Sequence, residues 1–336
     1  MPALFKIGRP QRVAPTSHMQ EKIIQFLKNT DGYISGEDMS QQLQVSRAAI
    51  WKYIDQLRQE GYEITAVPHL GYKLEAAPDK LLAHEVQFNL KTKIIGRRIV
   101  SLDTVASTMD EAFRLGMEGA VEGTVVCAEG QSQGRGRLGR GWASPKGKGI
   151  YASLILRPKL PPTQMSQLTL MTAVALAQAV HKTTILQPSI KWPNDLMVGS
   201  KKLAGILTEL RAETDQVKFV IVGIGLNVNA LSSQLLDTAT SLKIELGETV
   251  HRVELFQEIL RFMEFWYARV HKGRFDQVLD YCKKYSATIN KRVRIHDQSG
   301  DTQGLATGID SDGGILIRRD NGSIVKKMSG DITQLR

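Results

Sequence analysis

The spacing of hydrophobic residues changes twice along this chain, and that change limits the fold more than any single motif does. Residues 19–78 carry a helical spacing that ends in a hairpin pattern, whereas residues 82–285 alternate strand-like and helical stretches. From residue 286 onward the pattern is one of short strands and turns. We therefore predict an α+β chain with domains at residues 19–80, 81–285 and 286–336, since 336 residues suffice for two or three cores.

The segment before the first domain, residues 1–18, shows no periodicity. Ser17 and His18 lead into Met19, and this junction resembles the scar of an expression vector. We expect the segment to be disordered or vector-derived, and we leave it out of the fold.

Residues 19–80 have the pattern of a winged helix-turn-helix. Ser35 and Ser46 stand where N-caps are expected, each directly before a helical stretch. The second of these helices is predicted from residue 47 to about residue 60. Its apolar face consists of Ile50, Tyr53, Ile54 and Leu57. Strand patterns at 61–64 and 71–74 predict the wing.

A winged helix-turn-helix presents the N-terminal residues of its second helix to base edges in the major groove. Ser46, Arg47 and Lys52 are therefore the candidate DNA contacts. Arg47 suits a guanine or a phosphate, and both interpretations stay open. The charge of residues 19–80 is nearly balanced, which leaves a protein-interaction winged helix as the alternative.

The central region has the alternation of an α/β core with a mixed sheet. Strands are predicted at 94–102, 123–128, 150–156, 203–210 and 217–224. Helices are predicted after Ser107 and Thr108, over 165–181, and as a pair over 252–284. Thr108 and Glu111 have the spacing of a capping box, with a plain N-cap as the alternative.

The C-terminal region is predicted to form a small β-barrel of the SH3-like type. Its strand patterns lie at 293–295, 303–308, 315–317 and 323–325. Glycine-containing turns at 299–300, 312–314 and 321–322 separate them. Such short strands with tight turns are typical of small barrels.

A loop rich in glycine and in cations connects two of the central strands. This glycine loop, residues 134–149, contains Arg135, Arg137, Arg140, Lys146 and Lys148 and no acidic residue. Glycine lets the backbone approach a ligand closely, and arginine supplies charged donors in a fork. The combination fits a phosphate-bearing ligand, whereas the alternative is a solvated basic loop.

The first three glycines of the loop match the G-x-G-x-x-G pattern, but two dinucleotide-binding features are missing. A strand rather than a helix follows the glycines, and no acidic residue lies near residue 158. No catalytic or metal-binding kinase motif follows either. The glycine loop is therefore interpreted as a strand–loop–strand anion clamp.

Three further segments carry groups that suit a phosphate site. Within residues 191–195, Asn194 and Asp195 can hold Mg²⁺ or a hydroxyl, or simply form a turn. Lys202 begins a strand and is either an exposed turn charge or a phosphate contact. Residues 223–229 form a strand that opens into a glycine turn, without the lysine of a Walker motif.

Composition narrows the setting of this chain. The net charge of +10 suggests an anionic partner, either a nucleotide or a nucleic acid. No segment approaches the roughly 20 apolar residues that span a bilayer. Cys127 and Cys282 are the only cysteines, too few for a disulfide framework. We expect a cytoplasmic protein without a membrane partner.

Taken in order, these motifs resemble those of the biotin protein ligases. The resemblance runs from about residue 106 to residue 229 and rests on Ser107, Thr108, Gln131 and the segments 134–137, 191–195, 202–207 and 223–227. The predicted outer domains are similar to those of the longer members, which are both ligase and biotin-operon repressor, as in Gram-positive bacteria. Leu138 stands where some members carry another arginine, and Met109 where some carry a polar residue.

The resemblance implies a two-step reaction with ATP and biotin as substrates and Mg²⁺ as the metal. The biotin carboxylate attacks the α-phosphate of ATP, which gives biotinyl-5′-AMP and pyrophosphate. A lysine of an acceptor, such as the biotin carboxyl carrier domain of acetyl-CoA carboxylase, then attacks the mixed anhydride.

The resemblance also assigns the site residues. Biotin would be bound by Ser107, Thr108, Gln131, Gly136, Arg137, Lys202, Gly223 and Gly225. ATP or the adenylate would be bound by Arg135, Arg137, Arg140, Trp142, Lys191, Asn194 and Asn227. The catalytic groups would be Lys202, Arg135 and Asp195, and Asp195 would also position Mg²⁺.

For partners, the resemblance implies biotin carboxyl carrier proteins, operator DNA and a second copy of the chain when biotinyl-AMP is bound. Two-fold dimers fit palindromic half-sites. Two alternatives remain: a non-enzymatic regulator that only senses biotin, and a lipoate-type acyl ligase on the related core.

Overall fold

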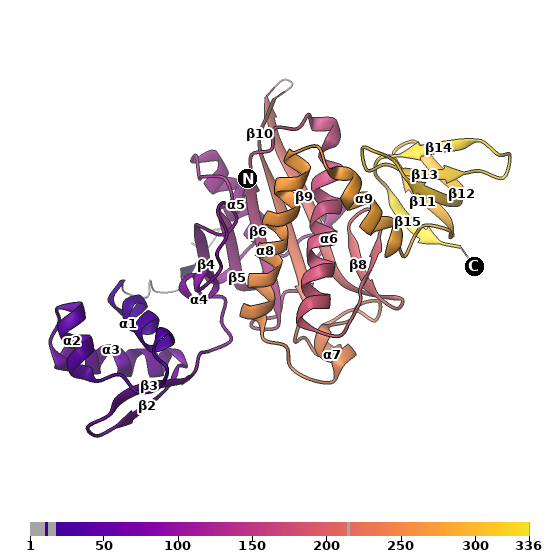
Figure 1. The fold of residues 1–336 in the computed structure, drawn as a ribbon. Helices are drawn as coiled ribbons and strands as arrows, with labels where there is room; N and C mark the ends of the chain where they lie inside the picture. Colours follow the sequence, from indigo (N-terminus) through magenta and orange to yellow (C-terminus); the bar gives the residue numbers. More distant parts are fainter. Residues whose placement is uncertain (1–10, 13–17, 214–215, 336) are drawn as a thin grey trace, which may run out of the picture.

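The computed structural model describes residues 11–12, 18–213 and 216–335 of the chain. A winged helical unit lies at one end, a large sheet with helices occupies the middle, and a small β unit lies at the other end (Figure 1). Most of residues 1–18 lie outside the described residues. Within that segment, Gln11–Arg12 (β1) pairs antiparallel with the edge of the central sheet.

The winged unit has the predicted order of elements. Its helices are α1 His18–Asn29, α2 Gly36–Leu43 and α3 Arg47–Glu60, and its wing is β2 Glu63–Val67 with β3 Gly71–Ala76. Both predicted N-caps are confirmed, because Ser35 Oγ accepts from Asp38 N at 3.0 Å and Ser46 Oγ accepts from Ala49 N at 3.2 Å. Ile50, Ile54 and Leu57 are buried in the core of this unit, as their spacing predicts.

The central sheet has eight strands in the order β1-β4-β5-β6-β10-β9-β8-β7. The strands are β4 Ile99–Val105, β5 Val125–Gln131, β6 Gly149–Leu156, β7 Ser189–Lys191, β8 Asp195–Val198, β9 Lys201–Glu213 and β10 Gln216–Asn227. Strands β4 and β5 are parallel and the other neighbours are antiparallel, which confirms the mixed sheet.

Helices cover both faces of this sheet. They are α4 Ala83–Gln87, α5 Thr108–Met117, α6 Ser166–Thr183, α7 Leu242–Leu246, α8 Arg252–His271 and α9 Phe275–Lys284. Val125 and Cys127 share a core with α6 and α8, whereas Val126 and Ala128 share one with α5. Successive strand residues point to opposite faces, so β5 is apolar throughout because both of its faces are covered. In Figure 1, α6 and α8 lie side by side across one face.

One predicted strand starts later than expected. The pattern over residues 94–102 is extended only from Ile99, because the segment before it bonds elsewhere. The carboxylate of Glu264 accepts from the backbone N–H groups of Lys93, Ile94 and Ile95. Those donors are therefore satisfied by a helix carboxylate rather than by a neighbouring strand.

The C-terminal unit is a five-stranded antiparallel sheet in the order β14-β13-β12-β11-β15. Its strands are β11 Arg292–Asp297, β12 Gly300–Ile309, β13 Ile315–Arg318, β14 Ile324–Lys327 and β15 Asp331–Gln334. The last strand has no counterpart among the sequence predictions. Among the described residues the edge strands β14 and β15 do not pair with each other, so a closed barrel is not confirmed.

The C-terminal unit is attached to the core beside β7. Trp192 is buried there, and its Nε1 donates to Gly313 O at 3.0 Å. Ser166, at the start of α6, donates to Asp312 O in the same turn. The turn between β12 and β13 is thus fixed to the core. Over residues 18–213 and 216–335, no helix is long and apolar enough to cross a membrane.

Candidate functional site

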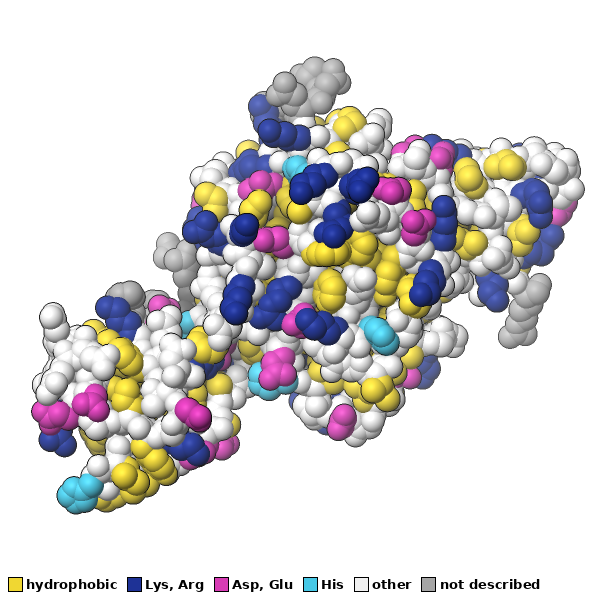
Figure 2. Space-filling model, viewed as in Figure 1, with side chains coloured by type: hydrophobic (Ala, Val, Ile, Leu, Met, Phe, Trp, Pro, Cys, Tyr) yellow, Lys and Arg dark blue, Asp and Glu magenta, His cyan; other side chains and the backbone are white. Residues whose placement is uncertain are grey.

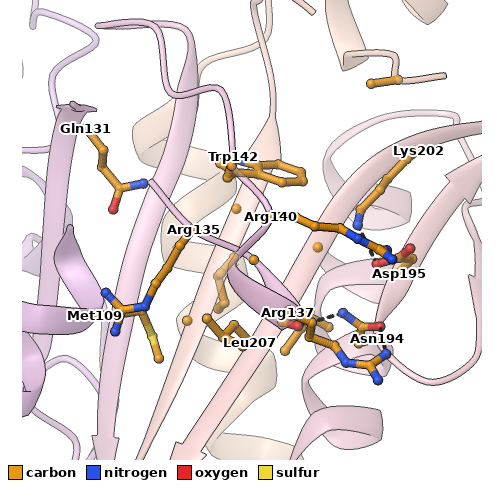
Figure 3. Close-up of a pocket in the computed structure, with 18 of the residues that line it drawn as sticks. Met109, Gln131, Arg135, Arg137, Arg140, Trp142, Asn194, Asp195, Lys202 and Leu207 are labelled. Carbon is orange, nitrogen blue, oxygen red and sulfur yellow. Dashed lines mark hydrogen bonds and ion pairs between the residues drawn. The ribbon is translucent and has the colours of Figure 1, made fainter. Parts of the chain in front are cut away.

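A pocket of about 250 Å³ lies where the glycine loop passes over strands β9 and β10 (Figure 3). The N-terminus of α5 closes one end, and Lys202 with Asp195 lies at the other. Thirteen of the predicted site residues line it: Ser107, Thr108, Gln131, Arg135, Gly136, Arg137, Arg140, Trp142, Asn194, Asp195, Lys202, Gly223 and Gly225. The structure thus brings together residues that are far apart in the sequence.

Uncharged polar groups gather at the α5 end of the pocket. Gln131 Oε1 accepts from Thr108 N at 2.8 Å and from Thr108 Oγ1 at 3.1 Å, while Gln131 Nε2 donates to Ser144 Oγ at 2.9 Å. Ser153 Oγ donates to Thr108 Oγ1 at 2.9 Å from the strand behind. These side chains bond to one another, and such a network favours a single arrangement of its polar groups.

The predicted capping box at this helix is wrong. Ser107, not Thr108, is the N-cap, and its Oγ accepts from Met109 N at 3.2 Å. Glu111 turns away and forms an ion pair with Arg114. The Thr108 hydroxyl therefore does not cap the helix. It bonds to Gln131 and Ser153 instead.

Glycines on β10 allow large side chains to lie flat on the floor. A Cβ on Gly223 would lie 2.5 Å from Met109 Sδ, and one on Gly225 would lie 2.5 Å from Trp142 Cε2. Real Cβ atoms do not approach other atoms that closely, so a side chain at either position would displace Met109 or the Trp142 indole. Met109 thereby forms part of the pocket wall, a role that its departure from the family pattern did not indicate.

Lys202 and Asp195 form the charged end of the pocket. Lys202 Nζ lies 2.6 Å from Asp195 Oδ1 and 5.4 Å from the centre of the Trp142 ring. The Lys202 backbone bonds to Thr238 and Thr240 in the loop after β10. The Nε1 of Trp142 is buried without a hydrogen-bond partner among the described residues. A ligand with an acceptor atom at that point would satisfy it.

The three arginines of the glycine loop point to different partners. Arg135 forms ion pairs with Asp110 on α5 and with Glu209 on β9, the latter at 3.1 Å. Arg137 Nη1 donates to Asn194 Oδ1 at 3.1 Å and to Gly330 O at 3.2 Å. Arg140 pairs with Asp331 of the C-terminal unit. Arg137 and Arg140 therefore tie the loop to that unit, whereas Arg135 lies beside Met109 in Figure 3.

Arg135 keeps its charge in this setting. Burial lowers the pKa of its guanidinium, but the hydrogen bonds that it donates to Glu209 and Asp110, together with their negative charges, outweigh burial and leave the pKa raised. Its two carboxylate partners also neutralise it. Of the three arginines, it is thus the one already supplied with two counter-charges before an anionic ligand binds.

Two predicted ATP-binding residues lie outside this pocket. Lys191 lies in an adjoining polar pocket, which it shares with Arg137, Arg140, Asn194 and Asp195. Asn227 is buried, and its Nδ2 donates to Thr240 O at 3.0 Å. The amide of Asn227 thereby holds the loop that bonds to Lys202.

Several pocket residues have no counterpart in the sequence prediction of the site. They are Met109, Gly205, Ile206, Leu207, Ile224, Leu236, Thr238, Ala239 and Asp331. The apolar residues on β9 and β10 have the sequence pattern of a buried strand. Only their proximity to Lys202 and Gly223 in the sequence indicates a site. No motif near Asp331 in the sequence indicates a site, because Asp331 reaches the pocket from the C-terminal unit.

The predicted DNA contacts lie at the N-cap and in the first half of α3. Ser46 uses its hydroxyl as the N-cap, while Arg47 is well exposed and 3.3 Å from Glu37 Oε2. Lys52 is exposed, and so is Trp51, which the sequence analysis did not select. In Figure 2 the face of the winged unit shows fewer Lys and Arg than the central unit. This agrees with the balanced charge of that segment.

Family models match three successive parts of the chain. Residues 19–73 match an HTH domain, residues 102–227 match the biotin/lipoate A/B protein ligase family, and residues 288–333 match the biotin protein ligase C-terminal domain. The pocket described above is built mainly from the second of these parts.

Among solved structures, the fold is similar to biotin protein ligase from Aquifex aeolicus in complex with biotin and ATP. The TM-score is 0.62 at 29% identity, over 71% of this chain and 99% of that one.

Similar relatives extend over nearly the whole chain. The bifunctional ligase/repressor BirA of Bacillus spizizenii is 42% identical over 304 residues, which cover 89% of this chain and 93% of the relative. The Bacillus subtilis protein of the same name is 41% identical, over 91% and 95%. The Escherichia coli protein is 30% identical, over 93% and 96%. The chain belongs to the biotin protein ligase family and, within it, to the bifunctional ligase/repressors.

Proposed function

We propose that this chain activates biotin with ATP to biotinyl-5′-AMP and transfers the biotin to a lysine of a carrier domain, such as that of acetyl-CoA carboxylase. We propose that the same chain represses genes of biotin synthesis and transport when the adenylate is bound. The observation that carries the proposal is the polarity of the pocket. At the α5 end, neutral hydroxyl and amide groups lie beside Arg135, whose charge is balanced by Asp110 and Glu209. At the other end, Lys202, Arg137 and Arg140 outnumber the carboxylates of Asp195 and Asp331. An uncharged bicyclic head group with a carboxylate tail matches that polarity.

The head group of biotin needs hydrogen bonds rather than charge, since its ureido group is neutral. Thr108, Gln131 and Ser107 offer hydroxyl and amide groups whose positions are already set. Met109 and Leu207 supply an apolar wall for the sulfur ring and the chain. A preset arrangement reduces the entropy that is lost when the ligand binds.

The first chemical step joins two anions. The biotin carboxylate oxygen attacks the α-phosphorus, the bond to the bridging oxygen breaks, and pyrophosphate leaves. Lys202 is the cation nearest to that reaction in our proposal. It breaks its ion pair with Asp195 and neutralises the charge that grows on the α-phosphate. Arg137 and Arg140 add charge from the loop, whose closure excludes water from a labile anhydride.

The second step needs a neutral amine close to the anhydride carbonyl. We propose that Asp195 orients the acceptor amine once Lys202 has turned to the phosphate. The amine nitrogen then bonds to the carbonyl carbon, and AMP leaves with the anhydride oxygen. The attacking nitrogen, which becomes positively charged when it bonds, loses one proton to give the amide. Positioning of the two groups supplies most of the rate gain in such a step.

Mg²⁺ fits this site only together with ATP. Within residues 18–213 and 216–335, no three His, Cys, Asp or Glu side chains are placed to hold a metal ion. Mg²⁺ commonly uses one or two carboxylates with substrate phosphates and water. Among the described residues that line the pocket, Asp195 and Asp331 carry carboxylates, and Asp331 is paired with Arg140. When bound, the ion would supply charge neutralisation on the phosphates.

The repressor role is assigned to the winged unit. We propose that Ser46, Arg47 and Lys52 face operator DNA and that two copies of the chain bind palindromic half-sites when they hold the adenylate. The near-neutral charge implies modest non-specific affinity. We also propose the boundaries 19–80, 81–285 and 286–336 for the three domains, and an SH3-like architecture for the last.

The decisive experiment is transfer of labelled biotin to a purified carrier domain in the presence of ATP and Mg²⁺. Labelled carrier is the expected product. If biotin binds but no label is transferred, the non-enzymatic biotin sensor replaces the ligase. Calorimetric titration with biotin and with lipoate tests the lipoate-type ligase, which requires the tighter binding to lipoate.

A further inference from the structure

A row of charges, in which Arg252 and Glu129 are buried and Asp79 is partly exposed, lies at the point where the winged unit joins the core. Arg252, the first residue of α8, is 2% exposed. Its Nε lies 3.1 Å from Asp79 Oδ2, and its Nη1 lies 2.9 Å from Glu129 Oε2. Asp79 lies just before α4 in the linker, whereas Glu129 is on β5, two residues before Gln131 of the pocket. The row therefore joins the linker to a strand of the site.

The linker side of this row is held through the backbone as well. Asp79 Oδ1 accepts from Arg252 N at 2.8 Å and from Val253 N at 3.2 Å, and Arg252 Nη2 donates to Asp79 O. Glu129 Oε1 accepts from Leu81 N at 2.6 Å. Two carboxylates and one guanidinium thus fix the path of the linker over residues 79–81.

The pocket side of the row holds the end of the glycine loop. Arg252 Nη1 donates to Gly149 O at 3.3 Å, and Glu129 O accepts from Gly147 N at 2.9 Å. Lys148 O, between these two residues, accepts from Asn229 N at 2.6 Å in the loop after β10. The arm by which the glycine loop returns to β6 therefore shares its contacts with the linker.

Beyond the linker, α4 is fixed to the winged unit. Glu85 is buried, forms an ion pair with Lys28 of α1, and accepts from Tyr62 Oη at 2.6 Å. Gln257 of α8 donates to the backbone oxygens of Glu85 and Phe88. The segment that follows residue 79 is therefore bonded both to the winged unit and to α8.

Only arginine can make the central contacts of this row. Its planar group has five donors in a fixed fork, whereas lysine has a single compact charge. Removing a partner from a buried ion pair leaves a charge without compensation, which is costly. Arg252 therefore fixes the positions of the linker, β5 and residues 147–149 relative to one another.

Resting on the proposed function, we propose that Arg252 is a positioning residue that couples the adenylate pocket to the linker of the DNA-binding unit. Order imposed on the glycine loop by biotin and ATP is passed by Arg252 and Glu129 to Asp79 and Leu81. Arg252 touches neither substrate in this proposal and acts through the segments that it holds.

Hydrogen–deuterium exchange of the full chain tests this coupling. In the wild type, biotin with ATP and Mg²⁺ should slow exchange in peptides from the glycine loop and also in peptides that contain the Leu81 amide. In Arg252→Lys and in Asp79→Asn, the slowing should persist in the glycine loop but be lost at Leu81. Asn keeps an oxygen that caps α8, so Asp79→Asn removes the charge with less damage to the fold.

Arg261→Lys is the matched control on the same helix. Like Arg252, Arg261 binds two backbone oxygens, those of Asn89 and Leu90, but it has one carboxylate partner, Glu258, and lies away from the glycine loop. This variant should keep the response at Leu81. An undiminished response at Leu81 in both Arg252→Lys and Asp79→Asn overturns the coupling. A wild type without slowing in the glycine loop contradicts the proposed function instead.

Transfer kinetics add a readout that a purely structural role would not move. If Arg252 helps to place the loop, Arg252→Lys should raise KM for biotin about tenfold, equivalent to about 1.4 kcal/mol. The kcat for transfer should stay close to the wild-type value, because Lys202 and Asp195 are untouched. A fall in kcat with KM unchanged would instead show that Arg252 serves the chemistry, and would contradict the positioning role.

Discussion

The floor of the pocket and the glycine loop above it are built in different ways. The floor consists of β9 and β10, whose residues are paired on both sides and packed on helices. The loop is held over it by ion pairs between partly exposed groups, such as Arg140 with Asp331. At its tip Leu138 is 77% exposed and has φ 57°. Packing thus sets the shape of the floor, whereas the loop is held by side-chain bonds of its arginines, some of them exposed pairs of modest strength such as Arg140 with Asp331.

This difference implies that the floor and the loop have different roles in the reaction. Groups on the floor should affect chemistry and binding strongly, because they cannot be replaced by neighbours or by water. Groups in the loop should affect retention of the intermediate, and their effects should depend on salt. Four substitutions test this difference between the floor and the loop.

Lys202→Ala, on the floor, should have the largest effect. Loss of one preorganised cation at the α-phosphate is expected to lower the rate of adenylation by about 10²–10³. The rate is measured as single-turnover release of pyrophosphate. Lys201→Ala changes the exposed neighbouring lysine and should leave the rate unchanged. A Lys202→Ala rate within about twofold of wild type would remove Lys202 from the mechanism.

Gly225→Ala should disturb the floor by crowding. The new Cβ would lie 2.5 Å from Trp142 Cε2, so the indole must move, at a cost of about 1–3 kcal/mol. We expect a raised KM for ATP with a smaller change in kcat. Gly308→Ala, where no atom lies within 4 Å of the new Cβ, is the control. An unaltered KM would show that Trp142 moves freely and that the floor is softer than its packing indicates.

Arg137→Ala should affect the loop more than the chemistry. It removes the contacts with Asn194 Oδ1 and Gly330 O, and bonds made by a charged donor contribute about 1.5–3 kcal/mol each. The adenylate should then escape before transfer, at a rate at least about tenfold faster if one such contribution is lost. Release of free biotinyl-5′-AMP into solution measures it. If adenylation itself fails, Arg137 belongs with the floor rather than with the loop.

Arg140→Gln should have the smallest effect of the four. Its partner Asp331 is partly exposed, and exposed pairs contribute about 0–1 kcal/mol. The KM for ATP should rise a few-fold at low salt, and the difference from wild type should shrink as salt screens the pair. A difference that persists at high salt would mean that Arg140 contacts the nucleotide closely.

The sequence predicted the fold well where the pattern is local. The caps Ser35 and Ser46 and the helix that follows Ser46 were all predicted from residues within a few positions of one another. The strand expected from residue 94 failed because Glu264, far along the chain, takes its donors. Strand β15 was missed because its short sequence has no clear alternation and depends on pairing with β11.

The site was predicted in part for the same reason. Motif residues such as Thr108, Gln131 and Lys202 do line one pocket. The sequence could not indicate that Arg135 pairs with Glu209, or that Asp331 enters the site from the C-terminal unit. Asn227 was expected in the site but packs behind it, where its amide bonds to Thr240.

The sequence alone determined the order of a winged helical part, a mixed-sheet core and a β part, many of their helices and strands, and a cationic glycine loop between two strands. These follow from preferences that act over a few residues, such as capping, side-chain alternation and the freedom of glycine. Tertiary structure decided which arginine meets which carboxylate, where Trp142 lies, and that Arg252 joins the linker to the pocket. Those contacts join residues that are tens to hundreds of positions apart, and only the packing of the folded chain brings them together.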